Sequence, residues 1–245
     1  MVVAGLIMIT LSTARRNVVQ VAALEEKTSL EIRVEAGVEM IVQDLIEHGQ
    51  RSRWLNTPGN HGKFQIEGME VEARVSDVRG LVDINSSDLE LLEPLLESHL
   101  GSVSARQAIE RLRENRARGV GRWGAYVDMS VALGLSIEQI ACLQPHTTLF
   151  SMLEQPDSRY APDALKALLQ LRGPEQKGSV ISEENVVTGQ TYKILVSSSG
   201  SLIRSANLVA ELLLTGKADQ PYVLRSWIWV PHISSASACR NDKEI

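Results

Sequence analysis

The feature that most constrains this chain is its apolar start. Residues 1–14 contain no charged side chain and no proline, and they run without a break into a helical pattern that ends near Gly49. An apolar stretch at the end of a helix must be buried in a membrane or against other helices. We therefore expect a helix over residues 1–50 that serves as a stalk for a polar globular remainder.

Composition limits what that remainder can be. The 245 residues are 44% hydrophobic and 22% charged, which suffices for one elaborate domain or two small ones. The net charge of −5 and the aromatic content of 4% disfavour a nucleic-acid-binding surface, which needs basic and stacking side chains. The two cysteines, Cys142 and Cys239, could pair only in an oxidising compartment, and one pair gives no disulfide framework.

Three interpretations of the apolar start are open. Because Arg15 and Arg16 end it, the run is shorter than the about twenty apolar residues that span a bilayer. It could be a signal peptide, although no basic residue precedes it, or a buried core helix. It could also be the later part of a membrane segment that begins before Met1. We expect the third, because the helical pattern continues past the apolar run.

Residues 17–48 have the period of an amphipathic helix. Apolar residues recur at spacings of three and four, and acidic residues lie off that stripe. We expect the stripe to pack under the protein's own sheet. Its members are Leu30, Val34, Val38, Ile41 and Leu45.

The period then changes to two. Residues 64–75 alternate between apolar and polar, and Gly68 marks a bulge or a tight turn between two strands. Alternation returns at 192–196, 206–212 and 222–230, and of these 206–212 could be strand or helix, with strand favoured. Because a lone hairpin buries little, we expect the early and late strands to form one sheet.

Between the two strand regions, residues 86–173 predict several short helices and no strand. Three pairs of residues have the spacing of a capping box. They are Ser87 with Glu90, Ser104 with Gln107, and Ser136 with Gln139.

These patterns predict an α+β fold in which a long N-terminal helix packs on an antiparallel sheet that is interrupted by an inserted all-α domain. The expected divisions follow the changes of period. They are the helix at 1–50, the two parts of the sheet at 51–83 and 178–231, the inserted domain at 84–177, and a disordered tail at 232–245.

A search for catalytic or metal-binding motifs finds none with specific spacing. The five histidines are isolated from one another, and no nucleophile elbow, P-loop or dinucleotide fingerprint occurs. Residues 83–88 are rich in oxygen ligands, but they lack the EF-hand arrangement, so a helix N-terminus is favoured over a calcium site. Six arginines within 106–122 are expected on a solvated helix face beside Glu110 and Glu114, in preference to a phosphate-binding or partner surface.

Four segments, in this order, carry a resemblance that spans nearly the whole chain. They are EAG at 35–37, DVRGLVDIN at 77–85, LFSMLEQP at 149–156 with APDALKAL at 161–168, and YKILV at 192–196 with PYVLRSW at 221–227. Together they resemble the minor pseudopilin K family of type II secretion systems (general secretion pathway protein K).

The resemblance implies a pilin-like fold and a structural role without enzymatic activity. It implies a tip or cap subunit of the secretion pseudopilus that supports protein export across the outer membrane. The N-terminal helix would be a transmembrane helix in the bacterial inner membrane, with the globular part in the periplasm. The implied partners are other minor pseudopilins and the major pseudopilin, with neither nucleic acid nor a small-molecule substrate. Family members carry a calcium site in an acidic loop, but no segment here matches it, so the cofactor is unknown and no ligands are assigned.

Apolar side chains in the first half of the N-terminal helix are the expected assembly and membrane residues, and ordinary burial in a helix is their alternative role. They are Val2, Leu6, Ile7, Ile9, Leu11, Val18 and Val21.

Two functions of other classes are alternatives. The sequence LQLRG at 169–173, among short helices, is similar to a helix-hairpin-helix nucleic-acid-binding module, although acidic residues outnumber basic ones in the block that contains it. The other alternative is a secreted hydrolase, which would require the apolar start to be removed at or near Arg15 as a signal peptide.

Overall fold

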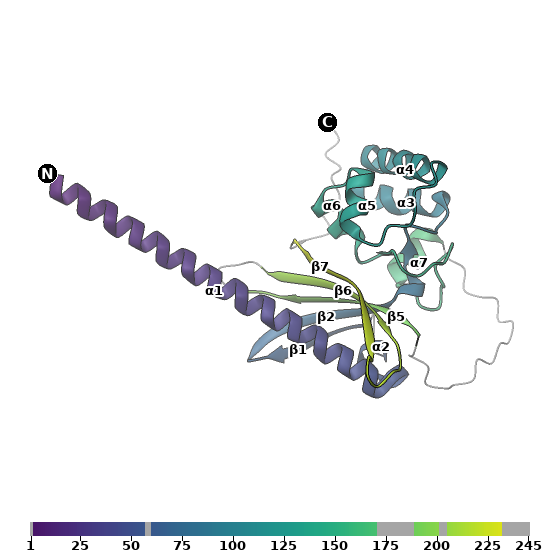
Figure 1. The fold of residues 1–245 in the computed structure, drawn as a ribbon, viewed down its shortest axis with the longest axis horizontal. Helices are drawn as coiled ribbons and strands as arrows, with labels where there is room; N and C mark the ends of the chain where they lie inside the picture. The colour runs from purple at the N-terminus through teal and green to yellow at the C-terminus, as the bar shows by residue number, and fades with distance from the viewer. Residues whose placement is uncertain (1, 57–59, 171–188, 201–204, 232–245) are drawn as a thin grey trace.

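One long helix, α1 (Val2–His48), organises the fold (Figure 1). Its second half lies across one face of a five-stranded antiparallel sheet, and a block of shorter helices contacts the opposite face. The computed structural model describes residues 2–56, 60–170, 189–200 and 205–231, with side chains from Thr13 onward except at Gln50. The predicted α+β fold, with a long helix on an antiparallel sheet and an inserted α-helical domain, is confirmed.

The sheet joins strands from two distant parts of the chain. Its order is β1-β2-β5-β6-β7, and each neighbouring pair is antiparallel. The pairing of β2 with β5 places Ala73 opposite Val196, so the early and late strand regions form one sheet, as the sequence predicts. The strands are β1 (His61–Ile66), β2 (Met69–Asp77), β5 (Thr191–Ser198), β6 (Ala206–Leu214) and β7 (Tyr222–Val230).

Gly68 forms a tight turn. Glu67 and Gly68 have positive φ angles of 50° and 78°, as in the two-residue turns that connect twisted antiparallel strands. The register irregularity of the sheet lies elsewhere, between β6 and β7 at Glu211/Leu212.

The apolar stripe of α1 is buried under the sheet, as predicted: Leu30, Val34 and Leu45 are fully buried. The helix approaches the sheet closely at Gly37. A Cβ atom there would lie 3.0 Å from Val196 Cγ1 and 3.1 Å from Phe64 Cζ, so a larger side chain would push helix and sheet apart. This close approach explains why the EAG segment at 35–37 ends in glycine.

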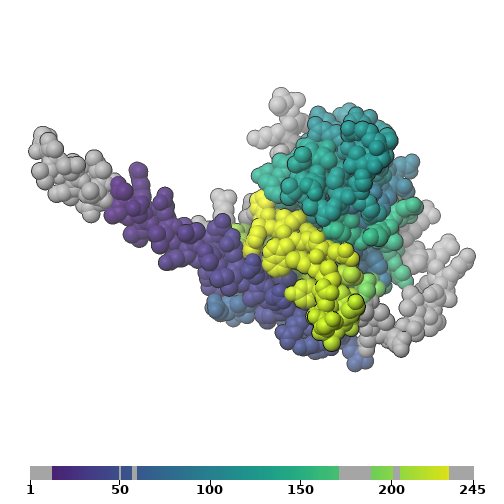
Figure 2. All heavy atoms as spheres, viewed as in Figure 1, coloured from purple at the N-terminus to yellow at the C-terminus, as the bar shows by residue number. Residues whose placement is uncertain are grey.

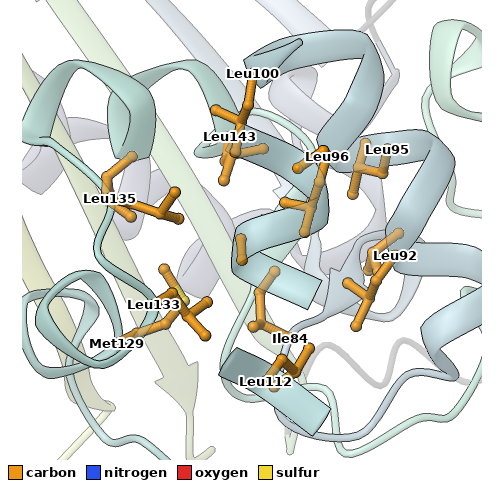
Figure 3. Close-up of a cluster of buried hydrophobic side chains, with 14 of the residues drawn as sticks. Ile84, Leu92, Leu95, Leu96, Leu100, Leu112, Met129, Leu133, Leu135 and Leu143 are labelled. Carbon is orange, nitrogen blue, oxygen red and sulfur yellow. The ribbon is translucent and has the colours of Figure 1, made fainter. Parts of the chain in front are cut away.

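The inserted helices form a second core of their own (Figure 3). Leucines of α3 and α4 meet Met129, Leu133 and Leu143 of the two following helices. Cys142 is disulfide-bonded, and Cys239, the other cysteine of the chain, lies outside the described residues. The helices are α3 (Leu89–Leu100), α4 (Ser102–Ala117), α5 (Tyr126–Leu133), α6 (Ile137–Leu143) and α7 (Asp163–Leu169).

This block also contains a strand that the sequence does not predict. Residues Val82–Asp83 (β3) and Thr147–Thr148 (β4) form a two-residue parallel pair. Such short strands have too few residues to show alternation. The divisions expected at 83/84 and 177/178 stay a prediction, since 171–188 lie outside the described residues, as does the tail at 232–245.

Only one of the three predicted capping boxes forms. Ser136 accepts a hydrogen bond from the Gln139 N–H, and the Gln139 side chain bonds back to Ser136. The other two helices begin at other residues. Gly101, with a φ of 77°, both ends α3 and takes the N-cap position of α4, so Ser104 lies inside α4. At the start of α3, Asp88 takes the N-cap position in place of Ser87.

Gly80 lets the chain pass close to another backbone segment where it leaves the sheet after β2. A short helical turn, Val78–Gly80, follows β2, and a Cβ at Gly80 would lie 2.2 Å from the carbonyl carbon of Tyr160. In addition, the Asp157 N–H donates to the Arg79 carbonyl oxygen at 2.8 Å, and the Arg79 guanidinium lies 4.0 Å from the centre of the Tyr160 ring. The glycine of the DVRG motif is needed because two backbone segments touch there.

We expect Gly80→Ala to lower the free energy of unfolding by about 1–3 kcal/mol, because the new methyl group overlaps the Tyr160 backbone. Urea unfolding measures the change. The matched control is Gly121→Ala, since a Cβ at Gly121 would meet no atom within 4 Å. Equal stability of the two variants would contradict the packing argument.

Candidate assembly helix and the docked helical domain

The first half of α1 extends beyond the globular part (Figures 1 and 2). Within its described side chains, from Thr13 onward, it presents apolar groups to solvent. Val18 and Val21 are 68% and 55% exposed. Val19 and Leu24 are exposed beside them. Since apolar area in water costs about 25 cal/mol per Å² relative to burial, this surface favours contact with a partner helix or with lipid.

The other expected assembly residues lie in the same helix, but their side chains are outside the described residues. They are Val2, Leu6, Ile7, Ile9 and Leu11. Their role, like that of the two exposed valines, stays a prediction.

Membrane-spanning segments were sought in the described part of the chain. No single helix there combines the length and the hydropathy that crossing a bilayer requires. By length and composition alone, α5 and α6 satisfy the requirement as a pair, with a bend of 115° between them.

A buried ion pair attaches the helical domain to the sheet. Lys193 of β5 and Glu211 of β6 are opposite one another in the sheet, on the face away from α1, and their charged atoms are 2.9 Å apart. Lys193 is 4% exposed and Glu211 is fully buried. A buried pair of this kind is tolerable only when its remaining hydrogen-bonding positions are satisfied.

The helical domain provides those partners. The hydroxyl groups of Tyr126 and Thr148 donate to the two oxygens of Glu211, at 2.7 Å and 2.9 Å. The Lys193 ammonium donates to the Thr147 carbonyl oxygen at 2.7 Å. Burial raises the pKa of Tyr126 well above its ordinary value and lowers the pKa of Lys193 in spite of the nearby carboxylate. The network fixes one orientation of the domain on the sheet, because any rotation would leave a buried charge without its partners.

The oxygen-rich segment at 83–88 holds neighbouring loops together by hydrogen bonds. Asp83 is fully buried and accepts hydrogen bonds from the backbone N–H groups of Asn85 and Met152. The Asn85 side chain donates to the carbonyl oxygens of Trp123 and Leu149. These contacts account for Asp83 and Asn85, and Asp88 of the same segment takes the N-cap position of α3, as the interpretation of a helix N-terminus predicts. Among the described residues, no group of three His, Cys, Asp or Glu side chains could hold a metal ion.

The arginines of residues 106–122 mostly bind the protein itself. Arg111 donates to the Leu133 carbonyl oxygen, and Arg116 donates to the carbonyl oxygens of Ile84 and Ser87. The other four also have partners inside the chain. Those partners are Ser102 for Arg106, Glu110 for Arg113, Asn115 for Arg118 and Asp83 for Arg122.

A histidine pair at the base of the helical domain was not predicted from the sequence. His99 and His146 stack with ring centres 4.6 Å apart, and Nδ1 of His146 is buried without a hydrogen-bond partner among the residues that the structure describes. Burial, together with the nearby cations Arg74 and Lys193, lowers the pKa of His146 from 6.5 to about 4. Burial also lowers the pKa of His99. The pair is far apart in sequence, so no spacing could have indicated it.

Comparison with known proteins finds a solved structure with this fold. No family model matches the chain, and no curated protein sequence matches it. A solved structure does match: a chain in the GspK-GspI-GspJ complex of the type 2 secretion system from enterotoxigenic Escherichia coli. The TM-score is 0.53 at 11% identity, and the match covers 87% of this chain and 100% of that chain.

This chain has the fold of a subunit of that complex. The match agrees at the level of the fold with the resemblance to the pseudopilin K family that the sequence motifs carry. Within this fold, the buried ion pair and the histidine pair both lie where the inserted helical domain meets the sheet.

We expect Lys193→Met to lower the free energy of unfolding by about 3–5 kcal/mol, because it leaves Glu211 buried without a counter-charge. The double variant Lys193→Met/Glu211→Leu should lose less than the sum of the two single variants. Urea unfolding of all four proteins measures this coupling. Additive losses would mean that the two side chains do not stabilise each other.

The histidine pair predicts that the globular part of the protein (residues 30–231, the head) loses stability in acid. The folded protein keeps His146 neutral down to about pH 4, while the unfolded chain binds a proton below about pH 6.5, so stability falls as the pH drops through this interval. The loss is on the order of 3 kcal/mol at most. Comparing unfolding at pH 7 and pH 4.5 for wild type and His146→Gln measures it. Identical pH dependence in both proteins would contradict the prediction.

Proposed function

We propose that this protein is a minor pseudopilin, a structural subunit of a type II secretion pseudopilus. The observation that carries the proposal is one continuous helix with two surfaces. Its second half is buried under the protein's own sheet, while its first half exposes Val18 and Val21 to solvent. The fold match to a subunit of the GspK-GspI-GspJ complex supports the same assignment.

The proposed place of the subunit is the tip of the pseudopilus. The inserted domain stands on the sheet face away from α1 and enlarges the head there (Figure 1). A bulky domain held in one orientation obstructs the addition of a further subunit above it. The hydrogen bonds of Lys193 and Glu211 to the domain hold it in that orientation. A subunit that joins the filament but blocks the addition of the next subunit would cap the filament and support protein export.

Before assembly, the proposed location is the bacterial inner membrane, with the apolar start of α1 in the bilayer and the head in the periplasm. The proposed partners are the other minor pseudopilins and the major pseudopilin, and the proposed role involves no catalysis. The nucleic-acid alternative has less support, because the arginines that would face phosphates bind the protein's own backbone and carboxylates.

The test is assembly of the full chain with the other pseudopilins of its secretion system. We expect Val18→Asp and Val21→Asp to prevent incorporation into the pseudopilus and to reduce export at least ten-fold. The reason is that a carboxylate on an assembly or membrane surface is costly, by about 2.5–3.5 kcal/mol at the centre of a membrane helix. Cross-linking within pseudopili and the amount of exported protein measure the two effects.

The matched control is Val131→Asp. Val131 is 77% exposed on α5, so the substitution should change neither incorporation nor export. Normal incorporation of the Val18 and Val21 variants would refute an assembly role for this surface. Absence of the wild-type chain from pseudopili would refute the proposed function itself.

A further inference from the structure

The sheet is wider than the helix that covers it. Five strands about 4.8 Å apart span roughly 20 Å or more, whereas a helix with its side chains is about 10–12 Å across. Helix α1 packs mainly on β5 and β6. The two margins of this sheet face, at β1 and at β7, therefore need other covers.

At the β1 margin, the chain itself provides the cover. The short helix α2 (Arg53–Asn56) places Trp54 on the sheet, where it is 2% exposed and contacts Phe64 edge to face at 5.4 Å. The edge strand also carries charge, since Lys63 pairs with Glu70 at 2.8 Å. Charged side chains on an edge strand discourage pairing with another chain.

At the β7 margin, the described residues leave a groove. It has a volume of about 420 Å³ and lies between α1 and the last strand. In Figure 2, β7 (yellow) lies open on the visible surface beside α1. Leu224 on this strand is 47% exposed. The side chains that line the groove are Val38, Glu39, Val42, Leu212, Tyr222, Leu224 and Trp227.

Among the described residues, the outer edge of β7 lacks the protection seen at β1. Arg225 is the only charged residue among the nine of the strand, which also carries Trp227 and Trp229. Trp229 is 37% exposed. A long apolar edge that stays open is typical of a surface that binds another chain.

The groove also has a charge pattern. Glu39 lines the groove, and Glu31 and Glu35 precede it at a spacing of four residues, which places the three acidic side chains along one side of α1. Glu39 accepts a hydrogen bond from the Tyr222 hydroxyl at 3.3 Å, which is long, and Glu31 lies 3.7 Å from Lys27. Glu35 is exposed and has no ion-pair partner within the described residues. A partner that enters the groove therefore meets an apolar floor with an acidic row along one side.

We propose that the groove between α1 and β7 receives an amphipathic helix of another pseudopilin subunit. Its apolar side chains would contact Leu224, Trp227 and Val42, and its Lys or Arg side chains would face Glu35 and Glu39. A helix fits this margin because β7 lies about one and a half strand spacings, roughly 7 Å, from the line between β5 and β6 on which α1 packs, close to the 8–10 Å between the axes of packed helices. A helix beside α1 would therefore lie over β7 and complete the layer. The proposal rests on the proposed function, since it takes the partner from the same filament.

The test places a photo-activatable cross-linking residue at Leu224 in the full chain, produced together with the other pseudopilins of its system. We expect a cross-link to a helical segment of one of them. Glu35→Lys/Glu39→Lys should reduce its yield at least five-fold by repelling the basic side chains. Lys→Glu or Arg→Glu substitution in that segment of the partner should restore the yield.

Two controls and a second probe make the result decisive. A cross-linker at Val131, which is 77% exposed on α5, and the substitution Glu93→Lys on α3 should have no such effects. A cross-link from Leu224 to the protein's own chain would overturn the groove proposal alone. The same holds if Leu224 gives no cross-link while a probe at Val18 still cross-links to pseudopilins. Absence of cross-links from both positions would overturn the proposed function with it.

Discussion

Burial of one face of α1 by the sheet is the interaction on which the rest of the molecule depends. The stripe that includes Val34, Val38 and Ile41 covers the central strands, and Gly37 lets the helix approach them closely. Because the same helix continues past the sheet, its direction is set by this contact, and its first half extends along a fixed line from the globular part. A single packing seam thus positions the proposed assembly surface.

The two faces of the sheet are stabilised by different means. On the α1 face, apolar side chains pack at high density, and the loss of any one leaves a cavity. On the opposite face, Lys193 and Glu211 form a polar contact with Tyr126 of the helical domain. Apolar packing tolerates small sliding movements, whereas a buried charge with fixed partners has one good geometry. The sheet therefore joins a closely packed helix to a domain held in a single orientation.

Much of the fold could be predicted from the sequence, because hydrophobic period reports local structure. The α1 stripe, the hairpin at Gly68 and the union of early and late strands all follow from spacing. The contacts that join distant segments could not be predicted in this way. Asn85 binding to Leu149, the stack of His99 on His146 and the groove at β7 depend on how elements meet. The exposed first half of α1 could be proposed as an assembly surface only from its apolar character, since spacing does not identify a partner.

The interruption of the sheet has a consequence for the order of folding. Strand β2 ends at Asp77 and its partner β5 begins at Thr191, so their pairing must close a very long loop. The helices between them are connected by short-range contacts, which form faster than long-range ones. During synthesis the helical block is complete before β5 emerges. The part of the α1 stripe that packs on β5 and β6 stays uncovered until those strands are made. The chain therefore passes through a stage in which apolar side chains are exposed along both halves of its longest helix, when shielding by a membrane or a chaperone would matter most.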